Sequence, residues 1–342
     1  MVILAFVIMQ ILISAGSISS LLQGLMVPLC TYIILAVSLN LVVGILGELS
    51  LGHAGFMCVG AFTSAFFSKC TRDVIASDGL RFFLALLIGI VTAAIFGMLI
   101  GIPVLRLKGD YLAIVTLAFG EIIKNMVNVL YIGKDSKGFH VTTKDVMALN
   151  MDADGTVILN GPQGITGTPK NSTFVIGFIL ILLTLFIVQN LINSRDGRAI
   201  MAIRDNRIAA ESIGINITKY KLMAFTISAA MAGAAGVLYA HNISTLTANT
   251  NNFGYNMSIT ILVFVVLGGI GNIRGSIIAA VILTLLPELL RGMKDYRMLI
   301  YAIVLIVMML FNWSPKAIEW REKLNDWRKK HFSFGKKAKE VE

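Results

Sequence analysis

The chain has 342 residues, of which 56% are hydrophobic and 14% are charged, and its mean hydropathy is +0.81. This composition excludes a soluble globular protein and indicates an integral membrane protein. The formal net charge of +10 is therefore interpreted as membrane topology and contact with anionic lipid, with no nucleic acid as a partner.

Long apolar runs predict the transmembrane spans, each of which needs roughly 20 residues to cross a bilayer. Ten runs qualify: 1–15, 27–46, 53–68, 82–105, 111–130, 173–192, 222–241, 256–270, 275–290 and 298–312. Four of them are short, so we expect an all-α fold of about eight to ten transmembrane helices, some of them short or broken. The first run lacks a basic start, which favours a span over a cleaved signal peptide.

The positions of the Lys and Arg residues predict the orientation. If both termini are cytoplasmic, eighteen of the 29 Lys and Arg residues lie inside and ten lie outside. Residues 1–313 then form a transmembrane domain with an external loop at 131–172, for which we prefer a role in docking an external partner. Residues 314–342 form a basic cytoplasmic tail, whose tryptophans 313, 320 and 327 predict an interfacial helix.

A polar stretch from Gly47 to Met57 separates two apolar runs. Two interpretations stay open: a broken or re-entrant helix that lines a cavity, or a tight inner turn with His53 bonded to a backbone carbonyl. The first interpretation makes a set of polar and small residues candidates for the translocation pathway. They are Asn40, Glu48, Ser50, Gly52, His53, Gly55 and Thr116.

Small residues predict close helix packing in two spans. Gly89, Ala93, Gly97 and Gly101 recur at four-residue spacing, which places them on one helix face. The span 222–241 is also crowded with Ala, Gly and Ser. In the fifth span, Glu121 and Lys124 lie three residues apart and are able to pair, either as a structural ion pair or in transport.

The segment from Arg195 to Lys221 is a basic island, with six Lys or Arg against three Asp or Glu. Its isoleucines predict one or two short amphipathic helices that end at Gly214. An apolar stripe held at a membrane face requires a partner groove or the lipid interface to cover it. We therefore interpret the island as a docking surface on the inner side.

Four blocks of this sequence, at 47–56, 107–117, 161–167 and 197–236, resemble the permeases of ATP-binding-cassette importers for branched-chain amino acids. The similarity is closer to the LivM type than to the LivH type. It implies a multi-pass protein of a bacterial or archaeal inner membrane. It also implies four kinds of partner: a LivH-like permease, two ATPase subunits, an external substrate-binding protein and membrane lipid.

The resemblance also implies an ATPase-coupling loop at 194–221. Importer permeases carry a Glu-Ala-Ala signature followed by Gly, and the matching residues here run from Ile208 to Gly214, with isoleucine in place of the first acid. The residues expected to touch the ATPase are Arg198, Arg204, Asp205, Ala209, Ala210, Glu211 and Gly214.

No nucleotide-binding loop of the Gly-x-x-x-x-Gly-Lys-Ser/Thr type occurs in the sequence, so we expect ATP and Mg²⁺ to bind on partner subunits. We infer no catalytic residues, no metal ligands and no cofactor in this chain. Two alternatives stay open. The first is an ATP-driven permease for urea or another small solute. The second is an ion-coupled secondary transporter that uses Glu48, Glu121 and His53.

Overall fold

A computed structural model describes residue 10, residues 20–290 except 73, 108, 153 and 154, and scattered positions from 296 to 310. Residues 1–281 form one compact unit and residues 282–342 a second. Only residue 10 of the candidate span 1–15 is described, about half of the residues of the span 298–312 are described, and the tail 314–342 lies entirely outside the described residues.

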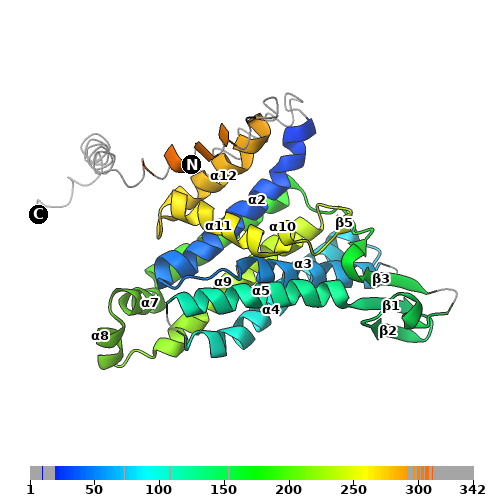
Figure 1. Cartoon of the computed structure of the whole chain (residues 1–342), viewed down its shortest axis with the longest axis horizontal. Helices are drawn as coiled ribbons and strands as arrows, with labels where there is room; N and C mark the ends of the chain where they lie inside the picture. Colours follow the sequence, from blue (N-terminus) through cyan, green and yellow to red (C-terminus); the bar gives the residue numbers. More distant parts are fainter. Residues whose placement is uncertain are drawn as a thin grey trace, which may run out of the picture. The chain divides into compact units, whose positions relative to one another are not determined.

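Long helices build the first unit, and the last of them, α12, continues into the second (Figure 1). They are α2 (Ser20–Asn40) with its π-helical continuation η1 (Leu41–Leu46), α3 (His53–Cys70), α4 (Asp78–Val104), α5 (Asp110–Val129), α6 (Phe174–Asn193), α9 (Ile217–Ala240), α11 (Tyr255–Gly268) and α12 (Ile273–Leu289). Within the described residues, six helices are long and apolar enough to cross a membrane. The candidate spans 53–68 and 275–290 form the helices α3 and α12, which are not among those six. The predicted class, an all-α membrane protein, is confirmed.

Helix α9 packs against α2, α3 and α4. Its small residues permit this packing: a Cβ atom on Gly60 of α3 would lie 2.4 Å from the carbonyl oxygen of Gly233 in α9. On the other side, the predicted ridge of α4 faces the same helix, since a Cβ on Gly97 would lie 2.5 Å from the Cβ of Ala229. Both predictions of close helix contact are confirmed.

The loop 131–172 contains a small sheet that the sequence patterns did not predict. Strands β1 (Tyr131–Asp135), β2 (Gly138–Thr142) and β3 (Thr156–Asn160) form an antiparallel sheet in the order β2-β1-β3. Two short 3₁₀ helices follow β2 and β3, namely η2 (Met147–Leu149) and η3 (Gly161–Gln163). Strand β4 (Ile165–Thr166) pairs with β5 (Thr245–Leu246), which follows α9.

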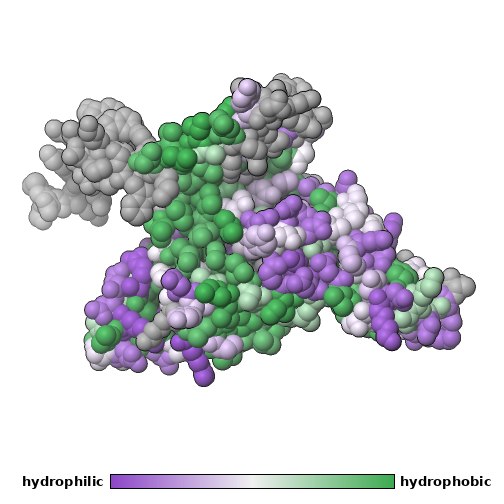
Figure 2. Space-filling view, viewed as in Figure 1, coloured by the Kyte–Doolittle hydropathy of each residue, from purple (hydrophilic) through white to green (hydrophobic). Residues whose placement is uncertain are grey.

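Figure 2 shows hydrophilic side chains over α7–α8, over β1–β3 and, between them, over the region of α10. The flank of α4 is apolar: its exposed side chains include Phe83, Leu87, Val91 and Ile95. Exposed apolar side chains along a spanning helix are what lipid contact requires.

Candidate functional site

The helix formed by α2 and η1 breaks at the polar stretch noted in the sequence. The π-helix η1 stops at Leu46, Gly47 adopts a positive φ of 79°, and helical structure resumes only at His53. A positive φ is easy for glycine and costly for other residues, so Gly47 fits this turn. The sequence-based expectation of a broken helix describes this backbone well.

His53 is buried, but its partner is not the backbone carbonyl that the turn interpretation required. Its Nε2 lies 2.6 Å from the hydroxyl oxygen of Ser38. Ser228 in α9 donates to the carbonyl oxygen of the same Ser38, at 2.6 Å. Ser38 of α2 is therefore bonded both to His53 of α3 and to Ser228 of α9, so these three helices are linked at one point.

The other candidate pathway residues are also held by neighbours. Asn40 donates to the hydroxyl of Ser276, and its side-chain oxygen accepts a bond from the backbone N–H of Gly271. Thr116 accepts a bond from the backbone N–H of Leu51.

Gly52 and Gly55 lie against α5: Cβ atoms there would approach the Thr116 carbonyl oxygen to 2.3 Å and the Gly120 Cα to 2.7 Å. Ser50 is buried, and its hydroxyl has no hydrogen-bond partner among the described residues. These contacts explain why small and polar residues occur here. A role in solute passage stays a prediction.

The basic island folds into two short helices, α7 (Arg195–Asp205) and α8 (Arg207–Ser212). Ser194 and Asn206 cap their N-termini by accepting backbone N–H groups, which are the groups that a helix start leaves unpaired. Gly214 follows α8 with a φ of +86° and open space around it. The sequence predicted one or two short helices that end at Gly214, and the structure confirms this prediction.

The island has its own small core. Ile203, Ala210 and Ile217 are buried together where α7, α8 and α9 meet. Ala210 is only 2% exposed, so it packs in this core below the expected docking surface and is not part of the exposed surface itself. The other expected contact residues are exposed: Arg198, Arg204, Asp205, Ala209, Glu211 and Gly214.

Two isoleucines of the island lie uncovered in the single chain. Ile208 is 81% exposed and Ile213 is 75% exposed. Ile208 belongs to α8 and Ile213 follows its last residue, so both lie in the basic island. Apolar groups surrounded by polar ones are typical of a protein interface, as the sequence analysis anticipated.

The island touches the helix break directly at two points. The guanidinium of Arg204 donates to the carbonyl oxygen of Gly44 at 3.2 Å, and its aliphatic stem covers Gly47, where a Cβ would lie 2.6 Å from Arg204 Cγ. At the second point, the ammonium of Lys221 pairs with the carboxylate of Glu48. The sequence analysis placed Lys221 in the island but did not select it as a site residue. Its partner is remote in the chain, so no local pattern reveals the pair.

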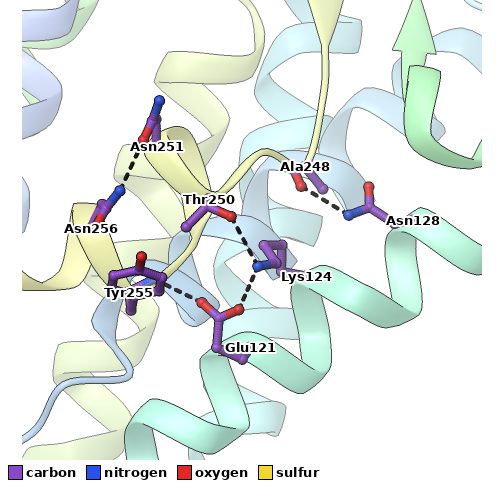
Figure 3. Close-up of polar contacts among 8 residues, drawn as sticks. All are labelled: Glu121, Lys124, Asn128, Ala248, Thr250, Asn251, Tyr255 and Asn256. Atoms are coloured by element: carbon purple, nitrogen blue, oxygen red, sulfur yellow. Dashed lines mark hydrogen bonds and ion pairs between the residues drawn. The ribbon is translucent and has the colours of Figure 1, made fainter.

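A second charged cluster joins α5 to another helix break (Figure 3). Lys124 pairs with Glu121 and donates to the hydroxyl of Thr250 in α10 (Thr250–Phe253) at 3.2 Å. Glu121 accepts a bond from the backbone N–H of Tyr255, the first residue of α11, at 2.8 Å. A carboxylate at a helix N-terminus is favourable. The predicted ion pair exists, and it fastens α11 to α5.

These observations define the class of the protein. It is a multi-span helical membrane protein in which a charged surface segment is bonded to the break that follows α2 and η1. A family model described as "branched-chain amino acid transport system / permease component" matches residues 21–311. The chain belongs to this family of transport permeases.

Curated relatives agree with the family match. The chain is 35% identical over 322 residues to the "high-affinity branched-chain amino acid transport system permease protein LivM" of Salmonella typhimurium, covering 84% of this chain and 67% of the relative. It is 34% identical to LivM of Escherichia coli, with the same coverage. It is 25% identical to E. coli LivH over 74% of this chain and 79% of LivH. No solved structure matches.

Proposed function

We propose that the chain is one of two permease subunits of an ATP-driven importer for leucine, isoleucine and valine. The other subunits are a LivH-like permease, two ATPases and an external substrate-binding protein. The printed names of the relatives, LivM and LivH permeases of branched-chain amino acid transport, support both the solute and the permease pair. The ATPases and the binding protein are inferred from the class of transporter.

The observation that carries the proposal is the double contact between the basic island and the helix break. A permease driven by a separate ATPase needs a surface that the ATPase grips and a route from that surface to the transmembrane helices. Arg204 and Lys221 provide such a route, because they bond to Gly44 and Glu48. A shift of α7 would therefore pull on the Gly44 side of the Gly47 turn through Arg204, and a shift of the start of α9 would pull on the Glu48 side through Lys221.

The exposed surface of α7 and α8 is the proposed ATPase contact. Its charged residues, which include Arg198 and Glu211, surround Ile208 and Ile213, and burial of those two side chains would favour binding by roughly 1.5–3 kcal/mol each. The departure at Ile208 from the acidic signature fits this arrangement, since an apolar residue there suits a hydrophobic contact better than a salt bridge.

The solute requires its own test, because related permeases are named for different cargo. The chain is 23% identical to a nucleoside permease, NupC, of Lactococcus lactis and 29% identical to an autoinducer 2 permease, LsrC, of Yersinia pseudotuberculosis. Branched-chain amino acids remain the proposed solute because the two LivM relatives, 35% and 34% identical over 84% of this chain, carry that name.

The test is reconstitution of the chain in liposomes with a LivH-like permease, candidate ATPases and a binding protein. We expect leucine-loaded binding protein to stimulate ATP hydrolysis and to drive leucine uptake, whereas urea and nucleosides do neither. Concentrative uptake by the chain alone, without nucleotide and in response to a pH gradient, would overturn the proposal in favour of an ion-coupled transporter.

A further inference from the structure

Strand β2 carries an exposed apolar face. Phe139 is 57% exposed and Val141 is 62% exposed. Alternate residues of a strand share one face, so these two side chains lie side by side on β2, which is an edge strand of its sheet. On the other face of the strand, Nε2 of His140 lies 3.0 Å from the carboxylate of Asp135. One face of β2 is therefore bonded within the sheet, and the other is apolar and open.

The strand lies close to the end of a spanning helix. Leu130 alone separates the last residue of α5 from the first residue of β1. Strand β2 then returns antiparallel to β1, with Val141 opposite Ile132. At about 3.3 Å per strand residue, Val141 is within about 10 Å of the end of α5, so β2 runs back toward the membrane.

A ring contact fixes the depth of Phe139 more closely. Its ring centroid lies 6.0 Å from that of Phe66 in α3. Phe66 precedes Cys70, the last residue of α3, by four residues, which is about 6 Å of helix. The Phe139 ring therefore lies beside α3 and not beyond its end.

The neighbouring helices expose apolar side chains at the same depth. Thr63, three residues before Phe66, hydrogen-bonds to Thr92 of α4 at 2.9 Å. A short connection joins the two helices, so α4 runs antiparallel to α3, and its first half extends past the level of Phe66. The exposed apolar side chains of that half and of the last turns of α5 include Leu80, Phe83, Leu87, Met126 and Val129. The open face of β2 thus continues a surface that faces lipid.

We propose that β2 lies in the lipid head-group region and that Phe139 and Val141 insert into the bilayer beside the ends of α3 and α5. An open sheet edge does not occur in the hydrocarbon core, so the backbone of β2 stays among the head groups. Only the two side chains reach further down, as the apolar face of an interfacial helix does. Lipid would then hold the 131–172 loop at the membrane surface.

The test measures the depth of β2 by fluorescence quenching in the full-length chain. Replacement of all three native tryptophans by phenylalanine gives a background without tryptophan. Single tryptophans are then introduced by Phe139→Trp, Val141→Trp or Ser136→Trp. Ser136 is the matched control, because it is equally exposed but lies in the turn between β1 and β2, away from α5. Lipids brominated in the acyl chains are the membrane quencher, and iodide is the aqueous quencher.

We expect brominated lipid to quench tryptophan at positions 139 and 141 roughly twofold or more above position 136, because only the first two are buried among acyl chains. Iodide should quench in the opposite order. Tryptophan itself favours the membrane interface, and position 136 controls for that preference. If iodide reaches positions 139 and 141 as readily as position 136, their face is open to water and the proposal is wrong.

The measurement is repeated with a LivH-like permease in the same bilayer. Unchanged quenching by brominated lipid would support a lipid contact. Loss of that quenching would show that the second permease covers the face, which would also overturn the proposal. Neither result depends on ATPase subunits or on the transported solute, so the proposed function is tested separately.

Discussion

Glu48 and Lys221 form an ion pair across 173 positions of the sequence, with the lysine side chain 4% exposed and the glutamate side chain 14% exposed. The pair joins the first residues of α9, which leave the basic island, to the break that follows η1. The pair therefore stabilises the contact between α9 and the break, and it is also part of the proposed coupling route. Experiments can separate these two roles.

Removing one charge of this pair should leave the other buried without compensation. We expect Glu48→Gln to destabilise the protein by about 3–5 kcal/mol and to reduce solute-stimulated ATP hydrolysis in the reconstituted transporter. The exchanged pair Glu48→Lys with Lys221→Glu should recover stimulation relative to either single variant. Wild-type stimulation in both single variants would show that coupling does not pass through this pair.

Gly214 tests the docking surface. Its φ of +86° disfavours a β-branched residue strongly and asparagine only mildly. Because the space around Gly214 is open, a clash with neighbouring atoms would not explain the effect of a substitution. We expect Gly214→Val to insert in the membrane but to lose most of the transport-linked ATPase stimulation, and Gly214→Asn to retain it. Pull-down of the ATPase together with uptake assays provides the measurement. Normal uptake by Gly214→Val would contradict the docking assignment.

The crossing of α3 and α9 tests the packing account. A Cβ on Gly60 would lie 2.4 Å from a backbone oxygen, which has no freedom to move aside. We expect Gly60→Val to cost several kcal/mol by overpacking and to lower the thermal unfolding midpoint in detergent. Gly24→Ala is the control, because nothing lies within 4 Å of its Cβ position, and it should stabilise α2 by about 0.5–1 kcal/mol. Similar midpoints for the two variants would refute this account.

Glu121 and Lys124 distinguish a structural ion pair from a proton-transfer site. Glu121→Gln should destabilise the α5–α11 contact, because Lys124 is 8% exposed and would lose its counter-charge. Adding Lys124→Met to this variant should restore much of the loss. The readouts are thermal stability and the pH dependence of uptake. A stable Glu121→Gln variant whose uptake has lost its response to a pH gradient would favour the secondary-transporter interpretation.

The sheet of the 131–172 loop should depend on pH through Asp135. Burial opposes its ionised form, but backbone N–H groups of Lys137, Asp152 and Gly138 and the side chain of His140 bind the carboxylate and hold its pKa below the ordinary value. A lowered pKa in the folded state stabilises the fold above the unfolded pKa of about 4, and that contribution is lost as the pH falls through the folded pKa.

We therefore expect the loop to become sensitive to an acid-active protease such as pepsin below about pH 4. Asp135→Asn should make it sensitive at neutral pH to trypsin as well. Lys144→Gln, at an exposed position in the same loop, is the control. Equal cleavage of the wild type and Asp135→Asn at pH 7 would exclude this role for the carboxylate.

Periodic features of the sequence predicted much of the fold. The four-residue spacing from Gly89 to Gly101 predicted a face of close helix contact, which α4 presents to α9, and the charges, isoleucines and Gly214 of the 195–221 segment predicted the island. Such signals are local, so they are readable without a structure. The β1–β3 sheet was missed because its strands are short, lie among charged residues and show no clear alternation.

The roles of the candidate pathway residues could not be predicted from the sequence. Polar residues in a span attract attention because lipid does not solvate them. In this structure, however, Asn40 and His53 bond to other helices and Thr116 bonds to the break that precedes α3. Sequence alone does not tell a polar side chain that faces solute from one that bridges two helices. Lys221 was overlooked for a related reason: its importance comes from Glu48, and no spacing rule connects them.

The π-helical turn at Leu41–Leu46 continues α2 up to Gly47. A π turn holds an extra residue compared with an α turn, so tightening it to α geometry would rotate the residues beyond it by about 100°. Such a rotation would carry Glu48 around the helix axis and separate it from Lys221 of α9.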